Sequence, residues 1–319
     1  MKVLVVRLSA LGDVAVTANA VYMLKKGLPD AEIHWLVEEE AAPLVLGFKF
    51  VDKVIPVSRR RYAKGMIRNP LKVLRMPLDA IGLLLKLRKG YDAVLDFQGN
   101  FRSGLLTFLS GAKKRIGFSA GRVYEGSHIF YTIKVRLPKQ LPRVERMMKL
   151  LDEIGVKSEP FMSTVPFEFT AEDRVVTERF LYEQRGFNKK LVVVHPGTSR
   201  FADFKRWPVK NYARLCCQLA CDPSLLVVVT WGKDEWFSAV NIVKEGGGAV
   251  IAPRFENPRQ LAYLLSRASL FIGGDTGPLH IAALFETPSV ALFGPKDPQV
   301  YKPWNRKCVV LRGDVKCSP

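Results

Sequence analysis

The chain has 319 residues, which suits two domains of about 150 residues, and its 48% hydrophobic and 25% charged residues are typical of a globular protein. No run approaches the roughly 18 to 20 uninterrupted apolar residues of a membrane span, and the first residues lack a secretory pattern, so we expect a cytosolic protein. Its five cysteines form no CxxC pair, which argues against a disulfide framework or a zinc site.

The positive charge is unevenly distributed. The formal net charge is +19, and residues 1–150 contain 27 basic and 12 acidic residues, whereas the remainder contains 22 basic and 18 acidic residues. The first half is therefore expected to face an anionic partner: a nucleic acid, a phosphorylated small molecule or an acidic lipid surface.

In the first half, short β-branched runs alternate with helical stretches. We expect strands at residues 2–6, 31–39, 52–57 and 91–97. Continuous Val, Ile and Leu runs of this kind, followed by Gly, Pro or Asp, predict a parallel sheet that is buried on both faces. Ligands of such sheets bind at the carboxyl ends of the strands, so the loops that follow them should contain the chemistry.

The first strand runs into a loop of small residues in the stretch VVRLSALGDVAVT, residues 5–17. This loop lacks the spacing G-x-G-x-x-G, which weighs against a nucleotide-dependent oxidoreductase with a Rossmann fold, the alternative from a different enzyme class. An acid, Asp13, stands where an anion would otherwise bind. From the residues alone, Asp13 is about equally well explained as a helix N-cap or as a general base.

Residues 59–75 contain seven basic residues and no acid. Five of them follow steps of three and four residues, which would place them on one face of a helix, although Asn69-Pro70 can divide the segment in two. Apolar residues are interleaved with these cations, and a basic face beside an apolar one suits an anionic membrane surface. A solvated charged face is the alternative. Further cations follow at Arg102, Lys113, Lys114, Arg115, Arg122, Lys139 and Arg143.

A second α/β domain is expected after a boundary near residues 155–170, where Ser and Pro accumulate and the helical period is lost. We place the boundary after residue 160, which gives domains at residues 1–160 and 161–319. Strands are expected within residues 190–197, 225–232, 248–253, 270–277 and 289–295, each run ending in Gly, Pro or Asp residues.

Three strand ends in this second domain carry residues that suit a nucleotide. The loop GGDTGPLH supplies glycines, Asp275, Thr276 and Gly277 before a helix whose first turn contains His280. Exposed amides at a helix N-terminus hold phosphate oxygens, and Asp275 can accept hydrogen bonds from sugar hydroxyls. A glycine turn with a capping Asp or Thr is the simpler interpretation of this loop taken alone.

The other two strand ends make a nucleotide site the better interpretation. The stretch HPGTSRFADFKRWP supplies Thr198, Ser199 and Lys205, and hydroxyls with a lysine make a good diphosphate clamp. The stretch VVTWGKDEW supplies Asp234 and Glu235, which can bind ribose hydroxyls.

The motifs DTGPLHIAAL, TPSVALFGPKDP, HPGTS with KRWP, and RLSALGD resemble those of the ADP-heptose-dependent lipopolysaccharide heptosyltransferases, glycosyltransferase family 9. The resemblance covers almost the whole chain, and VVEEEAAPLV, VIPVSRRRY and YDAVLDFQGNFRSG look most like the heptosyltransferase I group. It implies an α/β GT-B fold, in which two Rossmann-like domains with parallel sheets face each other across a cleft. The first domain would bind the acceptor and the second the nucleotide sugar.

The resemblance also implies the reaction. An inverting transfer would move L-glycero-D-manno-heptose from ADP-heptose to the Kdo sugar of lipid A–Kdo during assembly of the lipopolysaccharide inner core. No cofactor or metal would be required, and no nucleic acid would be bound. The enzyme would be cytoplasmic and peripherally associated with the anionic cytoplasmic face of the inner membrane. Heptosyltransferase II, or another ADP-heptose-dependent member with a different acceptor, is the closest alternative.

The resemblance assigns roles to individual residues. Thr198, Ser199 and Lys205 match diphosphate-binding positions, Asp275 matches the aspartate that holds the heptose, and Thr276, Gly277 and His280 surround the diphosphate. Either Asp234 or Glu235 would contact the ribose. Acceptor contacts are expected from Ser9, Arg59, Arg60, Arg61, Arg122 and Arg143.

The catalytic residues would be Asp13 and Lys205. The match to the family favours Asp13 as the base that takes the proton of the acceptor hydroxyl in a single displacement. Lys205 and the amides after Asp275 would take the negative charge of the leaving diphosphate.

Overall fold

The computed structural model describes residues 1–58, 76–121, 125–138, 141–157, 164–197, 206–232 and 234–313, and for residues 76–81 it describes the backbone alone. The chain divides into two compact units, Met1–Phe161 (unit 1) and Met162–Pro319 (unit 2). The boundary expected after residue 160 lies one residue before this division. Within the described ranges, no helix is both long and apolar enough to cross a bilayer.

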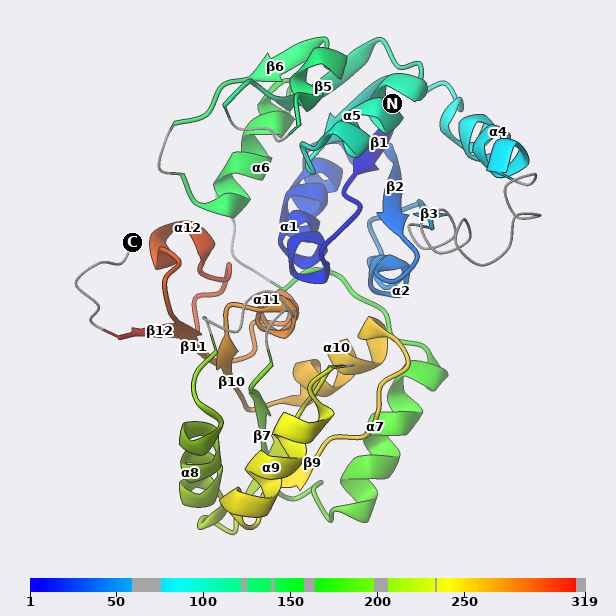
Figure 1. Ribbon diagram of the computed structural model, residues 1–319. Coiled ribbons are helices and arrows are strands. Elements are labelled where there is room, and N and C mark those ends of the chain that lie inside the picture. The colour runs from blue at the N-terminus through cyan, green and yellow to red at the C-terminus, as the bar shows by residue number, and fades with distance from the viewer. Residues whose placement is uncertain are drawn as a thin grey trace. The chain divides into compact units, whose positions relative to one another are not determined.

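Unit 1 is built around a parallel sheet with the strand order β3-β2-β1-β4-β5-β6 (Figure 1). Its elements in chain order are β1 (Lys2–Val6), α1 (Leu11–Gly27), β2 (Glu32–Glu38), α2 (Ala42–Val45), β3 (Lys53–Val57), α4 (Met76–Leu87), β4 (Ala93–Asp96), α5 (Phe101–Leu109), β5 (Lys114–Phe118), the 3-10 helix η2 (Ser127–Phe130), β6 (Ile133–Val135) and α6 (Arg143–Asp152). The four strands expected in this half are confirmed, and β5 and β6 extend the sheet on the far side of β4.

Unit 2 repeats this plan, with the strand order β12-β11-β10-β7-β8-β9. Its elements are α7 (Ala171–Glu183), β7 (Lys190–His195), α8 (Val209–Ala220), β8 (Leu225–Val229), α9 (Trp236–Gly246), β9 (Val250–Ile251), α10 (Pro258–Arg267), β10 (Leu270–Gly274), α11 (Gly277–Leu284), β11 (Ser289–Phe293), α12 (Pro298–Tyr301) and β12 (Cys308–Arg312). Counted from the first strand of each unit, both sheets have the doubly wound order 3-2-1-4-5-6.

Burial on both faces explains the continuous apolar runs of the central strands. Alternate side chains of a strand point to opposite faces, and in β1 all of Val3, Leu4, Val5 and Val6 are buried. Leu4 and Val6 belong to the core cluster that includes Leu87 of α4 and Leu106 of α5, and α1 packs against α6. The helices therefore cover the sheet and leave its carboxyl edge to the loops.

Local signals set where several helices begin. Asn100 caps α5, because its side chain accepts from the Ser103 N–H at 2.9 Å while the Ser103 hydroxyl accepts from the Asn100 N–H at 3.1 Å. Asn257 caps α10 in a similar way, and a proline follows it at the first helical position. Caps of this kind begin a helix directly after a strand or a short loop.

Candidate functional site

In each sheet the chain order reverses between two neighbouring strands, which are β1 and β4 in unit 1 and β7 and β10 in unit 2. Open α/β sheets bind ligands outside the carboxyl ends of the strands at such a point. Most of the described site residues lie there. Ser9 and Asp13 follow β1, whereas Asp275, Thr276, Gly277 and His280 follow β10; Asp234 and Glu235 follow β8, and Arg143 begins α6.

Seven predicted site residues lie outside the described residues: Arg59, Arg60, Arg61, Arg122, Thr198, Ser199 and Lys205. Their roles stay predictions.

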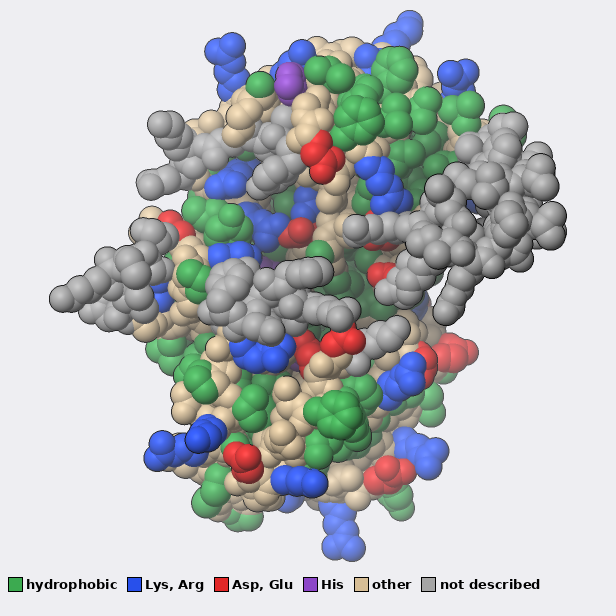
Figure 2. All heavy atoms as spheres, viewed as in Figure 1, with side chains coloured by type: hydrophobic (Ala, Val, Ile, Leu, Met, Phe, Trp, Pro, Cys, Tyr) green, Lys and Arg blue, Asp and Glu red, His purple; other side chains and the backbone are tan. Residues whose placement is uncertain are grey.

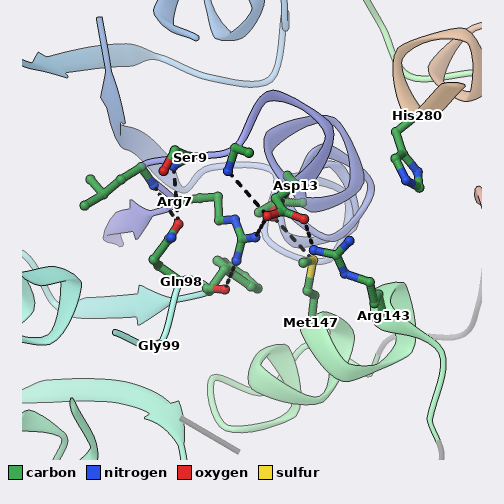
Figure 3. A network of polar contacts seen from close by, with 12 residues as sticks. Arg7, Ser9, Asp13, Gln98, Gly99, Arg143, Met147 and His280 are labelled. Carbon is green, nitrogen blue, oxygen red and sulfur yellow. Dashed lines mark hydrogen bonds and ion pairs between the residues drawn. The ribbon is translucent and has the colours of Figure 1, made fainter. Parts of the chain in front are cut away.

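Asp13 lies in the first turn of α1 and is held by two arginines (Figure 3). Its Oδ2 atom lies 2.6 Å from Nη2 of Arg7 and accepts from the Ala10 N–H at 3.3 Å. Its Oδ1 atom forms an ion pair with Nη2 of Arg143. The N-cap position belongs to Ala10, so Asp13 is a third-position acid that bonds back to the cap residue. Its side chain is 23% exposed, so a hydroxyl from solvent or from a ligand can reach it.

Arg7, the first residue after β1, fixes the orientation of this carboxylate. Its side chain is only 7% exposed; Nη1 donates to the Phe97 carbonyl, and Nη2 contacts Asp13. Burial lowers the pKa of Arg7 to about 10, against the opposing charge of Asp96, so the guanidinium stays charged at neutral pH. A buried cation needs an anion and hydrogen-bond acceptors to offset its lost hydration. Arg7 therefore ties Asp13 to the loop after β4.

The loop after β4 is itself rigidly held. Gln98 accepts through Oε1 from the N–H groups of Leu8 and Ser9, at 3.2 and 3.3 Å, which joins it to the loop after β1 (Figure 3). Asp96 at the end of β4 accepts from the N–H groups of Gln98 and Gly99 and from the Tyr131 hydroxyl. Complete burial raises the pKa of Asp96, although these hydrogen bonds oppose the shift. The two loops form one supported platform for Asp13.

In unit 2, Asp275 lies between two basic groups. Its Oδ2 is 2.5 Å from Nζ of Lys296, and its Oδ1 is 3.2 Å from Nε2 of His280. Burial alone would raise the pKa of Asp275, but the hydrogen bonds and charges of His280 and Lys296 outweigh it and hold that pKa well below its usual range. Asp275 is therefore an ionised acceptor at neutral pH and can bind the hydroxyl groups of a ligand.

Helix α11 begins beside Asp275 and offers backbone donors. Thr276 is its N-cap residue, but the hydroxyl donates to the Gly274 carbonyl at 3.3 Å and makes no capping hydrogen bond. N–H groups in the first turn of a helix suit phosphate oxygens, and the positive end of the helix dipole adds to this preference. The sequence-predicted set Asp275, Thr276, Gly277 and His280 is thus gathered at one helix start.

The two acids after β8 differ in their surroundings. Asp234 is exposed, whereas Glu235 is buried and accepts from the Gly232 N–H at 2.7 Å. Nε2 of His195, at the end of β7, lies 3.8 Å from Glu235, and the other ring nitrogen of His195 contacts Thr230. Burial lowers the pKa of His195, although Glu235 opposes the shift. Glu235 thus links the loops after β7 and β8, whereas the exposed Asp234 takes no part in these contacts.

The sequence-based interpretation missed Arg7 and Lys296. Each is a lone cation at or just beyond the carboxyl end of a buried strand, Arg7 after β1 and Lys296 in the loop after β11. Lys296 also lies over the ring of Tyr301, at 4.5 Å from the centroid. A basic residue within three positions of the carboxyl end of an apolar strand is the signal that could have identified both of them. Among the described residues, no three His, Cys, Asp or Glu side chains are grouped so as to hold a metal ion.

Comparison with known proteins identifies the family. The sequence profile of glycosyltransferase family 9 (heptosyltransferase) matches residues 82–319. The chain belongs to glycosyltransferase family 9. It is 30% identical over 301 residues to lipopolysaccharide heptosyltransferase 1 of Salmonella typhimurium, which covers 93% of this chain and 90% of that protein. The family match makes the chain a glycosyltransferase of the heptosyltransferase type and excludes the oxidoreductase alternative.

Solved structures of this family have the same fold. The Escherichia coli heptosyltransferase WaaC with ADP superposes with a TM-score of 0.79 and 26% identity, covering 98% of this chain and 94% of that one. The same enzyme with ADP-2-deoxy-2-fluoro heptose gives a TM-score of 0.76 and 27% identity over the same shares. The family 9 chain therefore has the GT-B fold that the sequence motifs implied.

Proposed function

We propose that this family 9 glycosyltransferase moves L-glycero-D-manno-heptose from ADP-heptose to Kdo of lipid A–Kdo, with inversion at the anomeric carbon. The observation that carries the proposal is the Asp13 carboxylate, oriented by Arg7 and paired with Arg143. An arginine recognises the carboxylate of a sugar acid well, and Arg143 lies directly beside the proposed base. An acidic acceptor sugar bound by Arg143 would thus have its hydroxyl near Asp13.

The names of the relatives support the donor and the acceptor class. A relative at 30% identity is a lipopolysaccharide heptosyltransferase, and the WaaC structures hold ADP and an ADP-heptose analogue. In unit 2, Asp275 would accept hydrogen bonds from the heptose hydroxyls, while Thr276, Gly277, His280 and the α11 amides would surround the diphosphate. Thr198, Ser199 and Lys205 would complete the diphosphate clamp. We assign the ribose contact to Asp234, because Glu235 is already engaged with Gly232 and His195.

The proposed reaction is a single displacement. Asp13 takes the proton of the attacking acceptor hydroxyl as its oxygen bonds to the anomeric carbon, and the bond between that carbon and the diphosphate oxygen breaks on the opposite side. Charge builds up on the departing ADP, where Lys205, Lys296 and the α11 amides would offer donors. Because one displacement occurs, the configuration at the anomeric carbon inverts. We propose that these cations make a metal unnecessary.

The acceptor also suggests where the enzyme works. Lipid A–Kdo is anchored in a membrane, so we propose that the enzyme acts at the anionic cytoplasmic face of the inner membrane. On this proposal, the excess of basic residues in unit 1 serves a phosphorylated lipid acceptor and not a nucleic acid. Ser9, Arg59, Arg60, Arg61 and Arg122 would contribute to acceptor binding together with Arg143.

Mass spectrometry of the reaction products tests the proposed function. The protein is incubated with ADP-heptose and either lipid A–Kdo or the same acceptor already carrying one heptose, with and without EDTA. We expect one heptose on the first acceptor in both buffers. Transfer to the second acceptor alone would show that the acceptor proposal is wrong, and loss of transfer in EDTA would show that a metal is needed.

A further inference from the structure

Helix α5 carries apolar side chains on its outer face as well as on its inner face. Leu106 belongs to the core, but Phe101, Leu105 and Phe108 are exposed, at steps of four and three residues along one side of the helix. Ile129 is exposed on η2, the 3-10 helix that packs against α5, and the four side chains are between 37% and 64% exposed. A helix with apolar side chains on two faces normally packs against something on both sides. We call these four residues the α5–η2 surface.

The α5–η2 surface is built as one unit. The ring of Phe130 in η2 contacts the rings of Phe101 and Phe108, with centroid distances of 5.3 and 6.1 Å. Gly104 makes this possible, because a Cβ atom at that position would lie 2.7 Å from the Phe130 ring and 3.0 Å from the Ser127 side chain. Figure 2 shows hydrophobic side chains gathered over this part of unit 1, with Lys and Arg side chains and an acidic side chain near them.

The charges around the α5–η2 surface are largely positive. Residues 101–118 contain four basic residues and no acid. Lys113 and Lys114 are exposed at the start of β5, and the Arg115 guanidinium lies 5.5 Å from the centre of the Phe108 ring. Acids also contact helix α5: Glu125 accepts from the Phe101 N–H at 3.3 Å, and Glu38 pairs with Arg102 at 2.6 Å. An apolar stripe beside cations matches the interface of an anionic bilayer, where apolar groups enter and cations meet the headgroups.

We infer that the α5–η2 surface docks unit 1 onto an anionic phospholipid bilayer. A second copy of the chain fits less well, because a symmetric contact through this surface would bring the cations of one copy against those of the other. The surface begins at Phe101, three residues after Gln98, which supports Ser9 and the Asp13 platform. The inference rests on the proposed function for the identity of the membrane, since a lipid-anchored acceptor would be presented from it.

Vesicle co-sedimentation tests the inference with the full chain and without donor or acceptor. Vesicles of phosphatidylethanolamine and phosphatidylglycerol are compared with vesicles of phosphatidylcholine. We expect Phe108→Ser and Ile129→Ser each to lower the partition coefficient for the anionic vesicles by about tenfold. The double variant Lys113→Gln/Lys114→Gln should lower it by roughly tenfold and weaken the preference for anionic lipid. Phe237→Ser, at an 82% exposed position of α9, is the matched control and should bind like wild type.

A second measurement uses a conservative change. Phe108→Trp should gain fluorescence that brominated anionic lipids quench, whereas the added tryptophan of Phe237→Trp should not be quenched. Unchanged vesicle binding of Phe108→Ser and Ile129→Ser would overturn the inference, as would absence of wild-type binding to anionic vesicles. A wild-type dimer that Phe108→Ser converts to monomer would assign the surface to a second copy. Vesicle binding without heptose transfer would contradict the proposed function but not the inference that this surface docks onto a bilayer.

Discussion

The proposed reaction depends most on Asp13, and the contacts of this carboxylate bear on its role as the proposed base. A carboxylate in the first turn of a helix is stabilised as an anion by the helix dipole, and two guanidinium groups strengthen that effect. Pairing with two guanidinium groups fixes the orientation of the carboxylate but disfavours its uptake of a proton. Arg143 begins α6 and is also a predicted acceptor contact, so an anionic acceptor that engages Arg143 would draw it from Asp13 and leave the base more able to take a proton.

Arg7 provides a direct test of the orienting role. Arg7→Met removes the contact with Asp13 and the donor to the Phe97 carbonyl. We expect kcat to fall by about tenfold to a hundredfold, with little change in the KM for ADP-heptose, because orientation of a base affects the chemical step. Arg7→Lys should lose less, since one ammonium group keeps the charge but not the planar fork. A wild-type kcat for Arg7→Met would show that Asp13 needs no such support.

Lys296 has a comparable role toward Asp275 in unit 2. Lys296→Met leaves the buried carboxylate with His280 as its basic partner and removes a cation beside the proposed diphosphate site. The dissociation constant for ADP-heptose should rise by about tenfold in calorimetry, and Lys296→Arg should restore part of the affinity. Lys302→Met, at an exposed position in the same segment, is the matched control. Equal affinities for Lys296→Met and Lys302→Met would contradict the assignment.

At the scale of elements, the loops after β7 and β8 are joined through Glu235. A Cβ atom on Gly197 would lie 2.1 Å from the Glu235 Oε2 atom, and one on Gly232 would lie 2.9 Å from it. These glycines make room for a buried acid that the Gly232 N–H and His195 hold in place. The position of the exposed Asp234 therefore depends on the packing of its neighbour.

Gly197→Ala tests this packing. The added methyl group must displace Glu235 or the loop after β7, so unit 2 should lose about 1–3 kcal/mol of unfolding free energy. The urea midpoint of unit 2 measures the loss, and affinity for ADP should fall with it. Gly313→Ala, where a Cβ atom meets nothing within 4 Å, should leave the midpoint nearly unchanged. Equal midpoints for the two variants would show that Glu235 adapts without cost.

Hydrophobic runs made most of the strands predictable, and short or charged strands were the exceptions. Most of the nine expected strands have continuous buried apolar runs, although β3 and the two-residue β9 lie at sheet edges. β6 has three residues, and β5 begins with Lys114 and Arg115, so neither has the continuous apolar run that burial on both faces imposes. Position in the sheet alone does not explain the difference, because the second-to-edge strands β2 and β8 are buried almost throughout.

Sequence motifs predicted the site residues that are close together in the chain, whereas tertiary packing brings together those that are far apart in it. Asp275, Thr276, Gly277 and His280 are close in sequence, so one helix start gathers them. Lys296 reaches Asp275 from the next strand of the sheet, and Arg143 reaches Asp13 from a helix 130 residues later. The pairing of β10 with β11 brings the first two residues together, and the packing of α6 against α1 brings the second two together. Tertiary packing also decides that Asp234 is exposed while Glu235 is buried.

At the scale of the whole molecule, the positive charge is concentrated in residues 1–150, and the donor is assigned to unit 2. Attraction between exposed charges is screened by salt, with a Debye length of about 10 Å at 0.1 M. Raising NaCl from 50 to 500 mM should therefore raise the KM for the anionic acceptor by about tenfold and the KM for ADP-heptose by less. Steady-state kinetics with each substrate varied in turn measures both values. An equal or larger rise in the KM for ADP-heptose would show that the salt effect arises mainly from donor binding by unit 2.

The most direct test of the central claim compares heptose transfer and donor binding in Asp13→Ala. If Asp13 is the base, transfer to lipid A–Kdo falls by roughly a hundredfold to ten-thousandfold, while the dissociation constant for ADP-heptose stays within about twofold of wild type. Asp13→Asn, which keeps the shape and the helix start, should lose transfer to a similar extent. Transfer near the wild-type rate by either variant would contradict the account.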